Sequence, residues 1–109
     1  MRYAIAVEGG QVSGHFGRCE RFLLVDIEDG QVQGREEMPC PAHQPGALPR
    51  LMVDKGVDVV VCGGLGPRAQ EMLADWGVQV LAGVSASVEE AIAGLTSGTL
   101  AVGQSTCDH

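Results

Sequence analysis

Basic residues and aromatic residues are both scarce in this chain of 109 residues. Seven Lys and Arg stand against 14 Asp and Glu, which gives a formal net charge of −7, and the aromatic residues are one Trp, one Tyr and two Phe. An acidic protein repels nucleic-acid backbones and anionic membrane surfaces, and base stacking needs aromatic side chains. We therefore expect neither a nucleic acid nor a membrane as partner.

Long apolar runs and C-x-x-C pairs are also missing, and no leader segment is expected. No apolar run approaches the ~20 residues that a membrane span needs. The stretch from Arg2 to Val7 is too short for a signal peptide, and Glu8 follows it directly. We expect a soluble, cytoplasmic protein in which thiols stay reduced. In that compartment the four cysteines should be metal ligands or core thiols instead of structural disulfides.

Hydrophobic patterning predicts one α/β domain over residues 1–102, followed by a polar tail over 103–109. Asp29-Gly30 is a hairpin signal, and Ser87 with Glu90 forms a capping box before the last helix. The segment from Gly9 to Gly17 is expected to be a loop. Strands are predicted at 3–7, 22–27, 32–38, 57–62 and 78–81, helices at 47–55, 67–76 and 88–95, and a short extended piece at 100–102.

This order of elements predicts the topology of the sheet. Right-handed crossovers place the fourth strand beside the first. We expect a mixed five-stranded sheet in the order 3-2-1-4-5, with strand 2 antiparallel to the rest and helices on both faces. The strand at 57–62 is apolar almost throughout, so it should be central, parallel and buried on both sides.

Every histidine in the chain lies within four residues of a cysteine. Thiolate and imidazole are ligands for Zn, Cu and Fe. Six such ligands exceed the four of a closed zinc site, so a metal–sulfur cluster fits better, with zinc as the alternative. Each pair also has a plainer explanation: a solvated loop histidine, a chance spacing, or a disordered tail. The pairs are His15/Cys19, Cys40/His43 and Cys107/His109.

Two glycine-rich loops follow strands that should end at one edge of the sheet. Their glycines allow a positive φ or the close approach of a ligand, and their arginines could balance an anionic cluster. Cys62 ends the fourth strand and is expected to be a core thiol, although a ligand role stays open. The candidate anion-binding residues are Gly14, Gly17 and Arg18 in the first loop and Gly63, Gly64, Gly66 and Arg68 in the second.

The second loop also matches the pattern G-x-G-x-x-A of dinucleotide-binding proteins, from Gly64 to Ala69. That fingerprint should follow the first strand of its unit, whereas here it follows the fourth, and the chain is too short for a second binding half. Nucleotide binding is therefore not expected.

Gly14-His15-Phe16-Gly17-Arg18, the apolar strand that ends at Asp26, and the run from Gly56 to Ala69 resemble the dinitrogenase iron–molybdenum cofactor biosynthesis family. These are small NifX-like domains, also found at the C-terminus of NifB-type proteins. The resemblance covers Tyr3 to about Leu95. It implies a three-layer ribonuclease-H-like fold without nuclease activity, and binding or carriage of Fe–S, Fe–Mo or other Mo-containing clusters, including Mo–Cu.

The resemblance extends to some candidate residues and not to others. The positions that match the family pattern are His15, Phe16, Gly17, Arg18, Gly63, Gly64 and Gly66. Cys19, Cys40 and the Cys107/His109 tail go beyond the common pattern and suggest a variant with more direct ligation of its cargo.

We therefore expect a non-enzymatic carrier or assembly scaffold for a metal–sulfur cluster, with cluster donor and acceptor proteins as partners; the oligomeric state is open. The alternative is a metal- or redox-responsive regulatory module that binds Zn or Fe. A hydrolase on the same fold is not expected, because two-metal chemistry needs clustered carboxylates and Glu8 and Asp58 should lie at opposite edges of the sheet.

Overall fold

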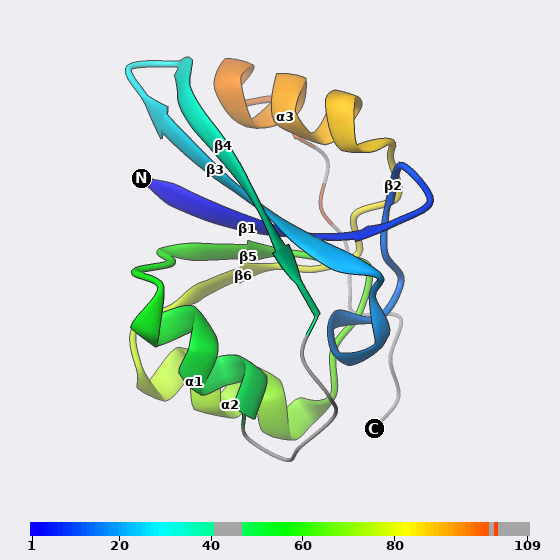
Figure 1. The fold of residues 1–109 in the computed structure, drawn as a ribbon, viewed down its shortest axis with the longest axis vertical. Helices are drawn as coiled ribbons and strands as arrows, with labels where there is room; N and C mark the ends of the chain where they lie inside the picture. The colour runs from blue at the N-terminus through cyan, green and yellow to red at the C-terminus, as the bar shows by residue number, and fades with distance from the viewer. Residues whose placement is uncertain (41–46, 101, 103–109) are drawn as a thin grey trace.

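The sheet lies between two layers of helices. The structure, a computed structural model, describes residues 1–40, 47–100 and 102. In Figure 1, α1 and α2 cover one face of the sheet and α3 covers the other. The strands are β1 (Arg2–Glu8), β2 (Gln11–Val12), β3 (Arg21–Glu28), β4 (Gln31–Pro39), β5 (Val59–Val61) and β6 (Gln79–Leu81). The helices are α1 (Ala47–Asp54), α2 (Pro67–Asp75) and α3 (Val88–Ser97), with a 3-10 turn, η1 (Phe16–Arg18).

The mixed sheet has six strands in the described part of the chain. Their order is β4-β3-β1-β5-β6, and β2 pairs with β1 off this path. β3 is antiparallel to β1 and to β4, whereas β5 is parallel to β1 and to β6. β5 is thus the parallel strand expected within residues 57–62; it lies between β1 and β6, next to the centre of the sheet, and all three of its residues are buried. Because β1 and β5 are parallel neighbours, the loops that follow them leave the same edge of the sheet.

The prediction of five strands was wrong because the expected loop over Gly9 to Gly17 contains β2. Gly9 and Gly10 have φ angles of +58° and +82°, in the left-handed region that favours glycine. This turn sends the chain back along β1, so that Val7 pairs with Val12. Two paired residues are too few to leave an alternating pattern in the sequence, which is why no strand was predicted there.

The predicted hairpin between the second and third strands is confirmed. Asp29 and Gly30 have φ angles of +52° and +73°, as both central residues of a type I′ turn require. Glu28 pairs with Gln31 across this turn, and the ladder continues to Arg21 and Pro39. β4 is at the edge of the sheet, and most of its side chains are exposed. The hairpin therefore brings the residues before β3 close to those after β4.

Alternate residues of the central strands supply two separate cores. In β1, Ala4 and Ala6 lie in the core under α1 and α2, while Ile5 and Val7 lie in the core under α3. Both faces of β1 and β5 are covered, which accounts for their apolar runs. The first core includes Phe22, Met52 and Leu73, and the second includes Val25, Ala91 and Ile92.

The last helix begins where the sequence predicts and ends two residues later than predicted, at Ser97. Ser87 Oγ accepts a hydrogen bond from Glu90 N at 3.1 Å, and Glu90 Oε1 accepts one from Ser87 N at 3.0 Å, so the capping box is formed. The expected extended piece at 100–102 is not a strand at either of its described residues. None of the helices in the described ranges combines the length and hydropathy that spanning a bilayer requires.

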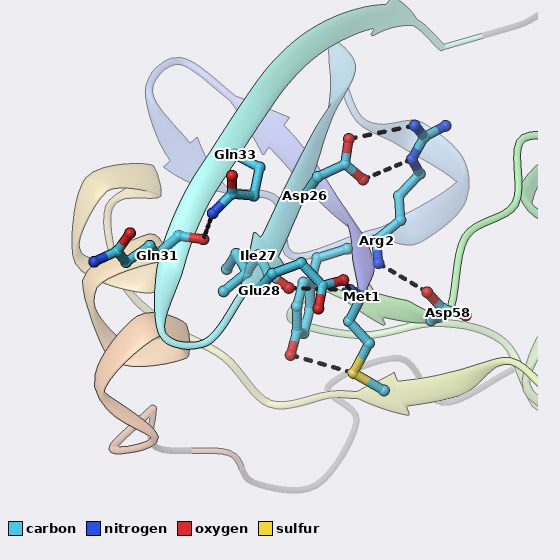
Figure 2. A network of polar contacts seen from close by, with 9 residues as sticks. Met1, Arg2, Asp26, Ile27, Glu28, Gln31, Gln33 and Asp58 are labelled. Atoms are coloured by element: carbon cyan, nitrogen blue, oxygen red, sulfur yellow. Dashed lines mark hydrogen bonds and ion pairs between the residues drawn. The ribbon is translucent and has the colours of Figure 1, made fainter.

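A polar network holds the amino end of β1 (Figure 2). Arg2 Nε donates to Asp26 Oδ1 at 2.9 Å, and Arg2 N donates to Asp58 Oδ2 at 2.8 Å. The hydrogen bond from Arg2 holds the pKa of the Asp26 carboxyl below its usual value. Glu8 ends β1 at its opposite end, so these carboxylates do not gather at one place. Asp26 and Asp58 thus stabilise the fold at the edge away from the glycine-rich loops.

Replacing Asp26 by asparagine should cost up to about 1 kcal/mol at pH 7, because the two paired side chains are 34% and 40% exposed and solvent weakens such pairs. Since the pKa of Asp26 is lowered by folding, this stabilisation is present above the ordinary carboxyl pKa and is lost as the pH falls through the folded-state value. Urea unfolding of the wild type and the variant at pH 7 and pH 3 measures this contribution to the free energy of unfolding. Glu71→Gln, at an exposed position of α2, is the control, and an equal cost of Asp26→Asn at both pH values would contradict the ion pair.

Candidate metal-cluster site

The loop of residues 13–19, here called the His15 loop, leaves the sheet at the carboxyl end of β1 and is held through Ser13. Ser13 is 1% exposed, and its backbone N donates to Ala6 O at 2.7 Å. The Ser13 hydroxyl accepts from His15 N and donates to His15 O, both at 3.1 Å. His15 has an extended backbone and an exposed side chain. The loop therefore presents an imidazole from a backbone that the hydrogen bonds of Ser13 hold in place.

The His15 loop is in direct backbone contact with the loop of residues 63–68, here called the glycine loop. Gly63 N donates to Ser13 O and Phe16 N donates to Gly64 O, each at 2.8 Å. A Cβ atom on Gly63 would lie 2.8 Å from Gly14 Cα, closer than real Cβ contacts. Only glycine at position 63 lets the two backbones approach this closely. The two loops predicted to bind a cluster are therefore joined to each other through their backbones.

Phe16 anchors the His15 loop in the first core. Its side chain is 2% exposed, and its ring meets that of Phe22 edge-on, with ring centroids 5.5 Å apart. Leu65 plays the same part in the glycine loop, with 2% exposure. The sequence pattern did not assign an anchoring role to Ser13, Phe16 or Leu65. A large apolar residue inside a loop rich in glycine and charge is the signal that could have revealed it.

The arginines of the two loops differ from the other arginines of the described chain. Arg18, at the end of η1, and Arg68, in the first turn of α2, are exposed and have no ion-pair partner among the described residues. Their guanidinium groups are therefore available to an anion at this edge. The arginines that do pair with carboxylates are Arg2, Arg21, Arg35 and Arg50.

The glycines of the His15 loop do not need left-handed backbone. Gly14 and Gly17 have no positive φ, and a Cβ on either would meet nothing within 4 Å. The sequence offered two explanations for these glycines, a positive φ and the close approach of a ligand. The structure excludes the first, and the second stays a prediction. The open space beside both residues is compatible with a ligand.

Three of the four cysteines lie within the described residues. Cys19 is 8% exposed, and its Sγ hydrogen-bonds to Phe16 O at 3.7 Å. Burial, followed by a hydrogen bond with Cys40, raises the pKa of the Cys19 thiol to about 12. Cys40 is half-buried against the same core. Cys62 is fully buried in that core, as its interpretation as a core thiol requires.

The structure thus brings together some predicted ligands and separates others. Cys19 and Cys40 meet at the first core, whereas His15 is exposed on the loop above. The described residues contain no group of three or more His, Cys, Asp or Glu side chains that could hold a metal ion. The remaining predicted ligands, His43, Cys107 and His109, lie outside the described residues.

Comparison with known proteins places this geometry in a family. The family model described as dinitrogenase iron-molybdenum cofactor matches residues 1–98. An uncharacterized protein of Methanocaldococcus jannaschii is 30% identical over 105 residues, which cover 92% of this chain and 89% of that protein.

Solved structures share the fold over nearly the whole chain. The crystal structure of PH0822 superposes with a TM-score of 0.87 at 35% identity, covering 94% of both chains. The NMR structure of a NifB-like protein from Thermotoga has a TM-score of 0.71 at 32% identity and covers 93% of this chain and 91% of its own. Since the family model spans both loops of the site and all three helices, this chain belongs to the dinitrogenase iron–molybdenum cofactor family.

Proposed function

We propose that this chain binds and carries a metal–sulfur cluster where the His15 loop meets the glycine loop, without catalysing a reaction. The cargo would be an Fe–S, Fe–Mo or other Mo-containing cluster, Mo–Cu included, and the family's iron–molybdenum cofactor supports this class. One observation carries the proposal. The backbone contact between Gly63 and Gly14 joins both loops beside an exposed histidine and two exposed, unpaired arginines of the described chain.

The residues at this edge have complementary roles toward such a cargo. The exposed imidazole of His15 can ligate a metal atom directly. The guanidinium groups of Arg18 and Arg68 can donate hydrogen bonds to the sulfides of an anionic cluster. α2 begins at Pro67 and is preceded by Gly66, and the positive end of a helix dipole favours an anion. Gly14 and Gly17 present backbone without side chains, and a Cβ on either would meet nothing within 4 Å, so a bulky cluster can come close.

The thiols are weaker candidates for direct ligation than the imidazole. Because the pKa of Cys19 is about 12, its thiolate is scarce at neutral pH unless a metal ion replaces the proton. Cys40 is less buried and is the more accessible thiol. Ligation by Cys19, Cys40, His43, Cys107 and His109 remains part of the proposal and rests on ligand chemistry alone.

His15→Ala should lower the amount of cluster retained by about tenfold or more, since losing groups that hold or orient a metal typically costs 10–100-fold in affinity. The protein would be incubated anaerobically with ferrous iron, sulfide and tetrathiomolybdate, desalted, and assayed for Fe, Mo and visible absorption. Gln33→Ala, on exposed β4, is the control. Unchanged retention by His15→Ala would remove this histidine from the site.

The wider proposal includes partners, location and fold relationship. A carrier needs a protein that donates the cluster and a protein that accepts it, and we propose both as partners in the cytoplasm. We also propose a ribonuclease-H-like relationship for the fold, supported by the three layers and the mixed sheet.

The contact between Cys19 and Cys40 favours a second candidate, a metal- or redox-responsive regulatory module that binds Zn or Fe. The two functions differ in what binding does. A carrier transfers its cargo to an acceptor protein, whereas a sensor changes its affinity for a partner and keeps its metal. Transfer of radiolabelled iron from the loaded protein to an acceptor would separate them.

A further inference from the structure

Cys19 and Cys40 lie next to each other at the open end of the β3–β4 hairpin. Arg21, the first residue of β3, pairs with Pro39, the last residue of β4. Cys19 precedes this pair by two residues and Cys40 follows it by one. Both side chains pack into the core that contains Phe22 and Met38. Strand register alone therefore brings two residues that are distant in sequence to the same place.

The two side chains share one core at the end of the hairpin, and their proximity shows in the acidity of Cys19. The pKa of the Cys19 thiol is raised first by burial and then by its interaction with Cys40. Cys62, the other described cysteine of this core, follows β5 directly and is fully buried, whereas Cys40 is only half-buried. Cys19 and Cys40 are thus neighbouring thiols, of which Cys19 is nearly buried and Cys40 is the more accessible.

We propose that Cys19 and Cys40 form a reversible disulfide, with a low-molecular-weight disulfide as the oxidant. The accessible Cys40 thiol loses its proton and attacks the oxidant. The oxidant's S–S bond breaks, one small thiol leaves with that proton, and a mixed disulfide remains on Cys40. Cys19 then loses its proton and attacks Cys40 Sγ, and the second small thiol leaves. Two electrons pass from the protein to the oxidant.

This inference is independent of cluster binding, because it concerns only the two thiols. A reversible disulfide differs from the structural disulfides that a reducing compartment disfavours, since transient, redox-sensing disulfides do occur there. Once the bond forms, neither sulfur can ligate a metal. Oxidation would therefore withdraw two of the candidate ligands from any cargo and leave His15 in place.

Glutathione disulfide is the probe for the test. The full chain with Cys107→Ser, which removes the fourth thiol, would be reduced, freed of reductant anaerobically and incubated with glutathione disulfide. We expect the loss of two free thiols, an intact mass lower by two hydrogens, and a peptide in which Cys19 is bonded to Cys40. Cys19→Ser in the same background should instead keep one glutathione on Cys40, and Cys40→Ser should react little.

Three outcomes would overturn the proposal. These are a lasting glutathione adduct on Cys40 while Cys19 is intact, a bond from either residue to Cys62, and no loss of thiols at all. Cys62→Ser is the matched control for a buried cysteine, and it should leave the Cys19–Cys40 bond unaffected. None of these outcomes bears on cluster retention, so the failure of one proposal can be told from the failure of the other.

Discussion

Replacing Gly63 by alanine is expected to lower the free energy of unfolding by about 2 kcal/mol and to disturb the proposed site. The new Cβ would lie 2.8 Å from Gly14 Cα and 3.2 Å from Ser13 O, and both are backbone atoms that cannot swing aside. Overpacking of this kind costs about 1–3 kcal/mol. Separating the loops would also weaken the hydrogen bonds from Gly63 N to Ser13 O and from Phe16 N to Gly64 O. Urea unfolding measures the first effect and cluster retention the second.

The chain supplies matched controls for this substitution in the same loops. Gly14→Ala and Gly17→Ala add the same methyl group where nothing lies within 4 Å and where φ is not positive. We expect neither to reduce stability measurably. If Gly63→Ala were as harmless as these two, the close backbone contact would not hold the loops together. Reduced cluster retention in a stable Gly14→Ala or Gly17→Ala protein would indicate that the cargo approaches these glycines.

The reduced protein is expected to lose stability above pH 9 because of Cys19. Folding raises the pKa of this thiol from 9.0 to about 12, chiefly by burial. The protonated thiol is favoured in the folded state, so the stabilisation is complete below pH 9 and is lost as the pH rises toward the folded-state pKa. Between pH 9 and pH 10 the free energy of unfolding should fall by about 1 kcal/mol from this group, because the unfolded thiol is already half ionised at pH 9. Urea unfolding at pH 9 and pH 10 under reducing conditions tests the slope.

Cys19→Ala isolates this contribution from other alkaline titrations. The other side chains are the same in both proteins, so the comparison of wild type with variant at each pH isolates the contribution of Cys19. The variant should be less stable than wild type at pH 9, because it leaves a gap in the core, and the difference should shrink by pH 10. A difference that is the same at both pH values would show that the pKa of Cys19 is not raised by folding.

Patterns that repeat along the chain were sufficient to predict most of the fold. The Asp29-Gly30 turn and the Ser87 capping box each have a local chemical cause, and each occurs as predicted. The buried strand predicted over 57–62 also forms, over the shorter range Val59–Val61. The two residues of β2 carry no local sequence signal that predicts a strand. It exists because the turn at Gly9 and Gly10 lays the chain against β1, a tertiary contact that periodicity does not record.

The candidate site was predictable in composition but not in arrangement. His15 and Cys19 were predicted as a ligand pair, yet the turn η1 between them exposes the imidazole and directs the thiol into the core. Phe16 causes this separation, because burying its ring sets the orientation of the loop. Conversely, Cys19 and Cys40 belong to different sequence pairs and meet only through the register of the hairpin.

The most direct test of the proposed function is metal and sulfide analysis of the protein purified under strictly anaerobic conditions. We predict iron or molybdenum in stoichiometric amounts, inorganic sulfide, and visible absorption bands that disappear on exposure to acid. A single tightly held zinc ion per chain with no sulfide would contradict cluster carriage and favour the regulatory module.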